Sequence, residues 1–135
     1  MSDNQELRRN WRANWLGSIQ EFADDDEQRR LWLDPPNPHF SFGEYLCCYF
    51  DDLNLSKGGY EWAINESLVS PDEAAAVAQF HYLADGYHSP TDDFDHLAIL
   101  ADPKWVAVVE AAKRSKVALL GLIDDPNERR LLTEA

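Results

Sequence analysis

The chain has 135 residues, of which 25 are acidic and 12 basic, giving a formal net charge of −13. This length suits a single domain spanning residues 1–135, and 44% hydrophobic residues supply a core, so disorder is disfavoured. The negative charge argues against binding nucleic acid or an anionic membrane, since both present phosphate. No segment approaches the roughly 20 apolar residues of a membrane span, and residues 1–12 lack the apolar stretch of a signal peptide. We therefore expect a cytoplasmic protein.

Apolar residues spaced three and four apart predict a first helix from about residue 4 to residue 23. Asp24, followed three residues later by Glu27, predicts the start of a second helix. That helix should end before the proline-rich residues 34–38, which we expect to form an extended connector. The apolar positions of the first helix are Leu7, Trp11, Trp15, Ile19 and Phe22.

Further helix starts follow from capping residues. Ser41 with Glu44 predicts a short helix running to Leu53, and the Ser-Pro-Asp-Glu sequence at 70–73 predicts a helix that ends near Gly86 in a left-handed conformation. The Asp-Pro pairs at 102–103 and 125–126 predict two more, whereas residues 97–100 are too few to assign by periodicity. The predicted fold is all-α, with six or seven short helices.

The negative charge is concentrated in the middle of the chain. Residues 1–30, 31–103 and 104–135 carry net charges of −2, −12 and +1, and the middle segment contains a single basic residue, Lys57. A charge needed only for solubility has no reason to be so concentrated, which favours an acidic surface for a basic partner.

Asp51 and Asp52 form the first candidate binding site. They are predicted at the C-terminal end of a helix, where a carboxylate is unfavourable by about 0.3–1 kcal/mol because it faces the negative end of the helix dipole. That cost is tolerable if the pair meets a cationic surface. The simpler alternative is a solvated helix end.

A second candidate is the acidic loop at residues 89–96, which contributes Asp92, Asp93 and Asp95. We prefer an acidic recognition patch here to a metal site, because the glycine and distal glutamate of an EF-hand loop and any His-Glu-x-x-His sequence are absent. A metal site assembled from His81, Asp85 and Asp95 is the less favoured alternative, and a loop that simply caps a helix is another. No cofactor is predicted.

Tyrosines and tryptophans are interleaved with the acidic residues of the middle segment. Such side chains bury a large area while keeping a polar tip, so they are enriched in protein interfaces. We take Tyr49 and Tyr87 as possible anchors of a partner and assign most of the others to the core.

Catalytic signals are weak. The chain has no glycine-rich phosphate loop and no Gly-x-Ser-x-Gly sequence, so we do not expect an enzyme. The adjacent Cys47 and Cys48 lie near acidic residues rather than the positive charge that activates thiols, and we expect them to be small buried hydrophobic residues.

One stretch resembles a known family. Residues 42–52, with Leu46, Tyr49, Phe50 and the Asp51–Asp52 pair, followed by the Ser-Pro-Asp-Glu-Ala sequence at 70–74, resemble immunity proteins of bacterial contact-dependent growth inhibition and related polymorphic toxin systems. Cys47 and Cys48 stand where that family pattern leads us to expect small residues. The resemblance implies an all-helical, non-catalytic cytoplasmic protein that binds and blocks one cognate toxin domain.

That function fits the charge, since a toxin that acts on nucleic acid needs a basic groove. The predicted inhibitory face comprises Asp51, Asp52, Asp92, Asp93 and Asp95, with Tyr49 and Tyr87. Two alternatives remain open at this point: a small acidic secretion chaperone or adaptor, and a DNA-mimicking inhibitor of a nucleic-acid-binding protein.

Overall fold

The computed structural model describes residues 2–33, 41–56 and 59–133, with side chains from residue 5 onward. These residues form eight α-helices and one π-helical turn, so the all-α prediction is confirmed. The predicted connector at 34–38 lies outside the described residues. The elements are α1 (Ser2–Ala23), α2 (Asp25–Trp32), α3 (Phe42–Leu46), η1 (Cys47–Asp51), α4 (Glu61–Asn65), α5 (Pro71–Asp85), α6 (His96–Ala101), α7 (Pro103–Leu120) and α8 (Pro126–Thr133).

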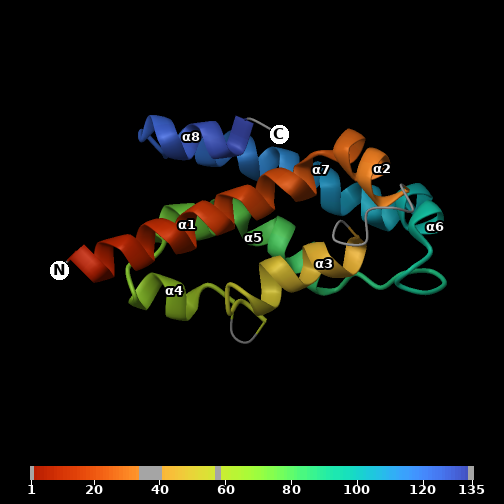
Figure 1. Ribbon diagram of the computed structural model, residues 1–135, viewed down its shortest axis with the longest axis horizontal. Coiled ribbons are helices and arrows are strands. Elements are labelled where there is room, and N and C mark those ends of the chain that lie inside the picture. The colour runs from red at the N-terminus through yellow and green to blue at the C-terminus, as the bar shows by residue number, and fades with distance from the viewer. Residues whose placement is uncertain (1, 34–40, 57–58, 134–135) are drawn as a thin grey trace.

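Helix α1 is the central element of the fold. It runs along the length of the molecule, with α8 on one side and α3 and α4 on the other (Figure 1), and it packs against α7, α8, α2 and η1. Helices α5 and α7 also pack against each other. The aromatic core between them includes Trp15, Phe22, Phe80 and Trp105, each at most 1% exposed.

The predicted helix starts are confirmed by side-chain caps. Asp24, Ser41 and Asp102 each accept a hydrogen bond from a backbone amide of the first turn that follows. Ser70 forms a complete capping box, in which its hydroxyl accepts from the Glu73 amide and the Glu73 carboxylate accepts from the Ser70 amide. These contacts are local, which explains why the sequence predicted them.

Three predictions about local structure need correction or completion. Gly86 ends α5 as expected, but its φ of −90° is not left-handed; the glycine that needs a positive φ is Gly59, at 60°. Helix α4 was not predicted, and residues 97–100 belong to α6. The segment from Ser41 continues past α3 only as the π-helical η1, a form that often occurs at functional sites.

Candidate protein-binding groove

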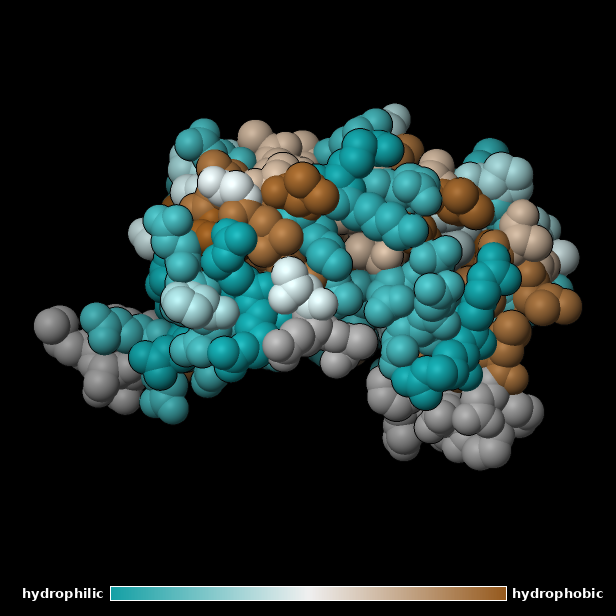
Figure 2. All heavy atoms as spheres, turned by 90° about the horizontal axis from the view of Figure 1, so that it is seen from above, coloured by the Kyte–Doolittle hydropathy of each residue, from teal (hydrophilic) through white to brown (hydrophobic). Residues whose placement is uncertain are grey.

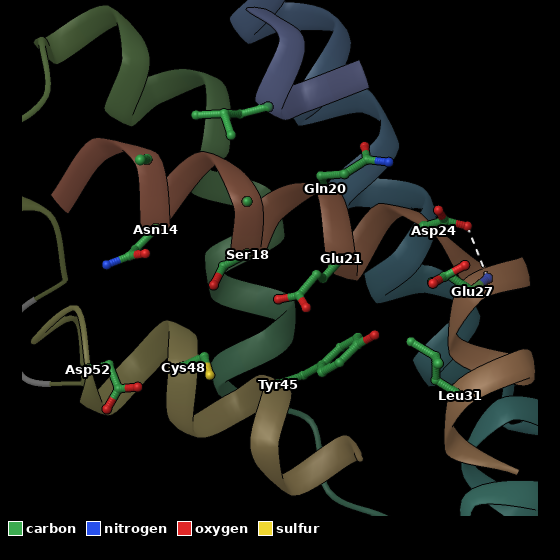
Figure 3. Close-up of a pocket in the computed structure, with 13 residues that line it drawn as sticks. Asn14, Ser18, Gln20, Glu21, Asp24, Glu27, Leu31, Tyr45, Cys48 and Asp52 are labelled. Carbon is green, nitrogen blue, oxygen red and sulfur yellow. Dashed lines mark hydrogen bonds between the residues drawn. The ribbon is translucent and has the colours of Figure 1, made fainter. Parts of the chain in front are cut away.

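A groove of about 610 Å³ runs along α1 between α2 and the α3–η1 segment (Figure 3). Helix α8 closes one side with Leu131. The residues that line this groove, as far as the structure describes the chain, include four carboxylates and no lysine, arginine or histidine. We call it the acidic groove; its carboxylates are Glu21, Asp24, Glu27 and Asp52.

The four carboxylates differ in how they are already engaged. Asp24 caps α2 by accepting from the Glu27 amide at 3.1 Å, and Glu27 pairs with Arg30. Asp52 is exposed at the end of η1. Glu21 is half-buried and makes no hydrogen bond or ion pair with its side chain among the described residues; burial raises its pKa above the ordinary value. Glu21 is therefore the least compensated charge of the acidic groove.

Two further polar side chains that line the acidic groove are buried. Gln20 is 7% exposed, and its Oε1 atom is buried without a hydrogen bond among the described residues. Tyr45 is 3% exposed, and its hydroxyl interacts with the indole of Trp32, whose ring centroid lies 5.1 Å from that of Tyr45. Figure 3 shows Tyr45 crossing the space between α3 and α2, below Glu21, whereas Gln20 points to the other side of α1. Burial, followed by the charge of Glu21, raises the pKa of Tyr45, so the phenol stays neutral.

The cysteines do not behave as a buried pair. Cys47 is exposed and Cys48, which lines the acidic groove, is partly exposed, so the expectation of buried hydrophobic residues is wrong for Cys47. Both are free thiols. Desolvation and then nearby carboxylates, Asp51 for Cys47 and Asp52 for Cys48, raise their pKa values. A raised pKa lowers the thiolate fraction, which makes these thiols poor nucleophiles at neutral pH.

The predicted aspartates fall into two groups on different parts of the molecule. Asp51 and Asp52 are exposed at the end of η1, and Asp52 lines the acidic groove. Asp92 and Asp93 are exposed in the loop before α6, at the end of the molecule in Figure 1. Asp95 is half-buried because it caps α6, accepting from the Ala98 amide at 3.2 Å; for this residue the capping alternative describes the structure.

The two tyrosines predicted as anchors are buried, so this part of the predicted site is wrong. Tyr49 is fully buried and packs between Phe22 and Phe80. Tyr87 is 7% exposed, and its hydroxyl donates to Asp102 at 2.9 Å. The aromatic rings of both tyrosines are buried in the core. Their position within an acidic stretch of the sequence does not show whether they are buried or exposed.

The exposed aromatic side chains lie elsewhere. Phe94, between Asp93 and Asp95, is 86% exposed, and Leu97 one turn away is 67% exposed. Figure 2 shows hydrophobic atoms at both ends of the face that it presents, with hydrophilic atoms between them. Phe94 was not singled out from the sequence, although an aromatic residue between acidic residues was the available signal.

The metal alternative receives no geometric support. No group of three or more histidine, cysteine, aspartate or glutamate side chains within residues 5–33, 41–56 and 59–133 is arranged to hold a metal ion. His81, Asp85 and Asp95 are therefore not brought together. Asp95 is used as a helix cap, while His81 takes part in a different interaction.

His81 ends a buried chain of hydrogen bonds. Its Nδ1 lies 2.8 Å from the Tyr49 hydroxyl, which lies 2.5 Å from the Tyr60 hydroxyl. Trp15 Nε1 donates to Tyr60 at 2.8 Å. Tyr60 accepts from Trp15; in the other two contacts either hydroxyl can donate, and the role of His81 Nδ1 depends on the tautomer. Burial lowers the pKa of His81, although the charge of Asp85 opposes this shift.

This arrangement predicts a loss of stability at mildly acidic pH. The folded-state pKa of His81 lies below the ordinary 6.5. The contribution of neutral His81 to the free energy of unfolding is therefore complete above pH 6.5. As the pH falls below that value, this contribution is lost by up to about 1.4 kcal/mol per pH unit for one proton. Urea unfolding at pH 7.5 and 5.5 measures the effect. His81→Asn should reduce this pH dependence relative to the native protein, whereas His88→Asn, at an exposed position, should preserve it. An unchanged dependence in His81→Asn would contradict the assignment.

The chain matches no family model, no curated protein and no solved structure in the comparisons made. Across the described residues, no helix has the length and apolar character needed to cross a membrane.

Proposed function

We propose that this protein is a cytoplasmic immunity protein that binds and neutralises a cognate toxin domain through an acidic surface, acting by binding rather than catalysis. The observation that carries the proposal is the acidic groove, with four carboxylates and no basic residue among those that line it. The resemblance of residues 42–52 and 70–74 to immunity proteins supports the same function. The toxin surface that it covers would be basic.

Electrostatic complementarity explains how such a protein would work. A concentrated negative field accelerates association with a basic partner, and fast capture suits the neutralisation of a lethal protein. A nuclease is a fitting target because its substrate groove must be basic to hold phosphate. Asp51 and Asp52, at one end of the acidic groove, and Asp92 and Asp93, in the loop before α6, would contribute to the negative field.

The direct test is a pull-down with the product of the immediately upstream reading frame, followed by calorimetry. We expect a stoichiometric complex with a basic C-terminal toxin domain and inhibition of that domain. Raising the salt from about 0.05 M to about 0.5 M should slow association at least tenfold, because salt screens the charges that steer the partners together. An unrelated enzyme upstream that does not bind would overturn the proposal.

The chaperone or adaptor alternative draws on a different observation. Val117, Leu122 and Leu131, near the C-terminal end of the chain, are 71%, 44% and 37% exposed. A chaperone needs a persistent hydrophobic face and commonly dimerises, so a monomer by light scattering would count against it. A DNA mimic would share the acidic groove but would bind a nucleic-acid-binding protein rather than the upstream product.

A further inference from the structure

Phe94 and Leu97 form an exposed hydrophobic surface at the start of α6, which we call the apolar patch. Phe94 is 86% exposed, the highest fraction of any large hydrophobic side chain in the described chain, and Leu97 is 67% exposed. The patch lies beside the end of α2 (Figure 1), where His96 Nδ1 is 3.0 Å from the Trp32 carbonyl oxygen. Leu33, which follows α2, is 42% exposed.

The fold does not use the Phe94 ring for packing. Phe94 precedes Asp95, the N-cap of α6, and an apolar side chain at that position often packs against the fourth residue of the helix. The fourth residue is Ile99, which is fully buried without this contact, because the Phe94 ring remains in water. A solvent-exposed apolar patch of this kind is typical of a surface that binds another protein.

Hydrogen bonds order the loop that presents Phe94. The Phe94 amide donates to Asp92 Oδ1 at 2.8 Å, and the Thr91 hydroxyl donates to Asp95 Oδ2 at 3.0 Å. The Ser89 hydroxyl donates to the Asp92 carbonyl at 2.6 Å. Asp95 in turn attaches the loop to α6 as its cap. A loop that is already ordered loses less conformational entropy when a partner covers it.

The charge around the apolar patch limits the kind of partner that fits it. Asp92 and Asp93 are exposed in the same loop, and residues 88–101 include three aspartates and no lysine or arginine. Repulsion disfavours an anionic membrane and a second copy of this chain, whose net charge is −13. The complementary surface is an apolar pocket bordered by lysine or arginine.

We infer that the apolar patch inserts Phe94 into an apolar pocket with a basic border on the toxin domain; this inference rests on the proposed function. The patch adjoins the acidic groove through α2, since Leu31 lines the groove and the next residue, Trp32, contacts His96. One partner surface can therefore cover both. Phe94 supplies the water-excluded aromatic contact at the centre of the patch, and the two flanking aspartates lie at its rim.

The aromatic centre and the acidic rim affect different rate constants. Rim charges act chiefly on association, whereas contacts at the centre of an interface act chiefly on dissociation. Phe94→Ala should therefore speed dissociation of the toxin domain roughly tenfold or more and leave its association rate within about twofold. Phe94→Leu keeps an apolar side chain, so it should speed dissociation less than about threefold. Surface plasmon resonance gives both rate constants.

Tyr82→Ala is the matched control. It removes an aromatic side chain of α5 that is 76% exposed and lies outside both the apolar patch and the acidic groove, so neither rate constant should change. Native dissociation of Phe94→Ala would overturn the inference, as would equal losses in the two alanine variants. Phe94→Ala should also melt at the native temperature; a lower temperature would show that the ring packs within the fold and would contradict the inference.

A probe other than the toxin domain tests the apolar patch by itself. The isolated protein is titrated with a synthetic amphipathic helix composed of leucine and lysine, and NMR follows the Phe94 ring and the Leu97 methyl groups. We expect saturable shifts of both, and no shifts with the matched peptide that carries glutamate in place of lysine. Equal responses to the two peptides, or shifts confined to the acidic groove, would overturn the inference.

The two experiments together separate this inference from the proposed function. If the lysine peptide shifts the apolar patch but the native protein does not bind the upstream toxin domain, the proposed function fails and the patch remains a site for a basic, apolar partner. If the native protein binds that domain and Phe94→Ala binds it with native kinetics, the proposed function stands and the inference fails.

Discussion

Replacing Arg12 with alanine should lower the free energy of unfolding by about 3–5 kcal/mol, as expected when a buried ion pair loses one partner. Arg12 is 3% exposed. It forms hydrogen bonds to both oxygens of Glu73, at 2.9 and 2.7 Å, and to Glu128 at 2.8 and 3.0 Å. Its Nη1 also donates to the Leu68 carbonyl at 2.8 Å. The substitution leaves two carboxylates uncompensated, and urea unfolding measures the loss.

The role of Arg12 is to join segments that are distant in the sequence. It ties α1 to the capping box at the start of α5 and to α8. Burial alone raises the pKa of Glu73, but the hydrogen bonds from Arg12 and the Ser70 amide outweigh burial, so the pKa lies below the ordinary 4.5. The stability that ionised Glu73 contributes to the fold is therefore present at neutral pH and is lost as the pH falls through 4.5 and below.

Two controls distinguish the ion cluster from a general effect of losing an arginine. Arg9→Ala removes an exposed arginine of the same helix and should change stability by less than about 0.5 kcal/mol. Combining Arg12→Ala with Glu73→Gln and Glu128→Gln should recover part of the loss, because no buried charge then lacks a partner. A loss below about 1 kcal/mol for Arg12→Ala alone would contradict the structural role.

If the acidic groove is the inhibitory face, the double variant Glu21→Lys, Asp52→Lys should weaken binding of the toxin domain roughly hundredfold or more. Two attractive contacts become repulsive, and coupling energies of close charge pairs across interfaces reach about 1.5–7 kcal/mol. Calorimetry or surface plasmon resonance gives the affinity. The melting temperature of the double variant, measured alongside, shows whether it remains folded at the temperature of the assay.

The matched control places the same charge change elsewhere. Asp92→Lys with Asp93→Lys also moves the net charge from −13 to −9, but these aspartates lie in the loop before α6 and do not line the acidic groove. We expect this pair to cost less than about tenfold in affinity, chiefly through slower association. Equal losses in the two variants would point to overall charge, and a larger loss in the loop variant would identify that loop as the interface.

The sequence by itself determined the helical class and most helix starts. These features depend only on residues within one or two helical turns, so they can be recognised without the rest of the chain. They are the apolar spacing in residues 4–23 and the caps at Asp24, Ser41, Ser70 and Asp102. The short helix α4 escaped prediction because it has no side-chain cap. The conformation of Gly86 was mistaken because a glycine permits a left-handed residue without requiring one.

Only the tertiary structure decided where the acidic groove lies. Residues 1–30 are nearly neutral in sum, yet they supply Glu21, Asp24 and Glu27 to it. Two arginines of the same segment are engaged away from the acidic groove: Arg12 is buried in the ion cluster, and Arg8 donates to the Ser67 carbonyl. Charges of opposite sign are thus separated by folding, and a running sum along the chain conceals that separation.

The same reason explains the mistaken tyrosines. The sequence placed Tyr45, Tyr49 and Tyr87 in one acidic segment, but burial depends on which face of each element meets the α1–α7 core. Tyr49 faces Phe22 and Phe80 and is satisfied by Tyr60 and His81. Tyr45 is also buried, and its ring packs against Phe22 and Trp32. Long-range packing alone decides which aromatic residues of the acidic segment are buried in the core.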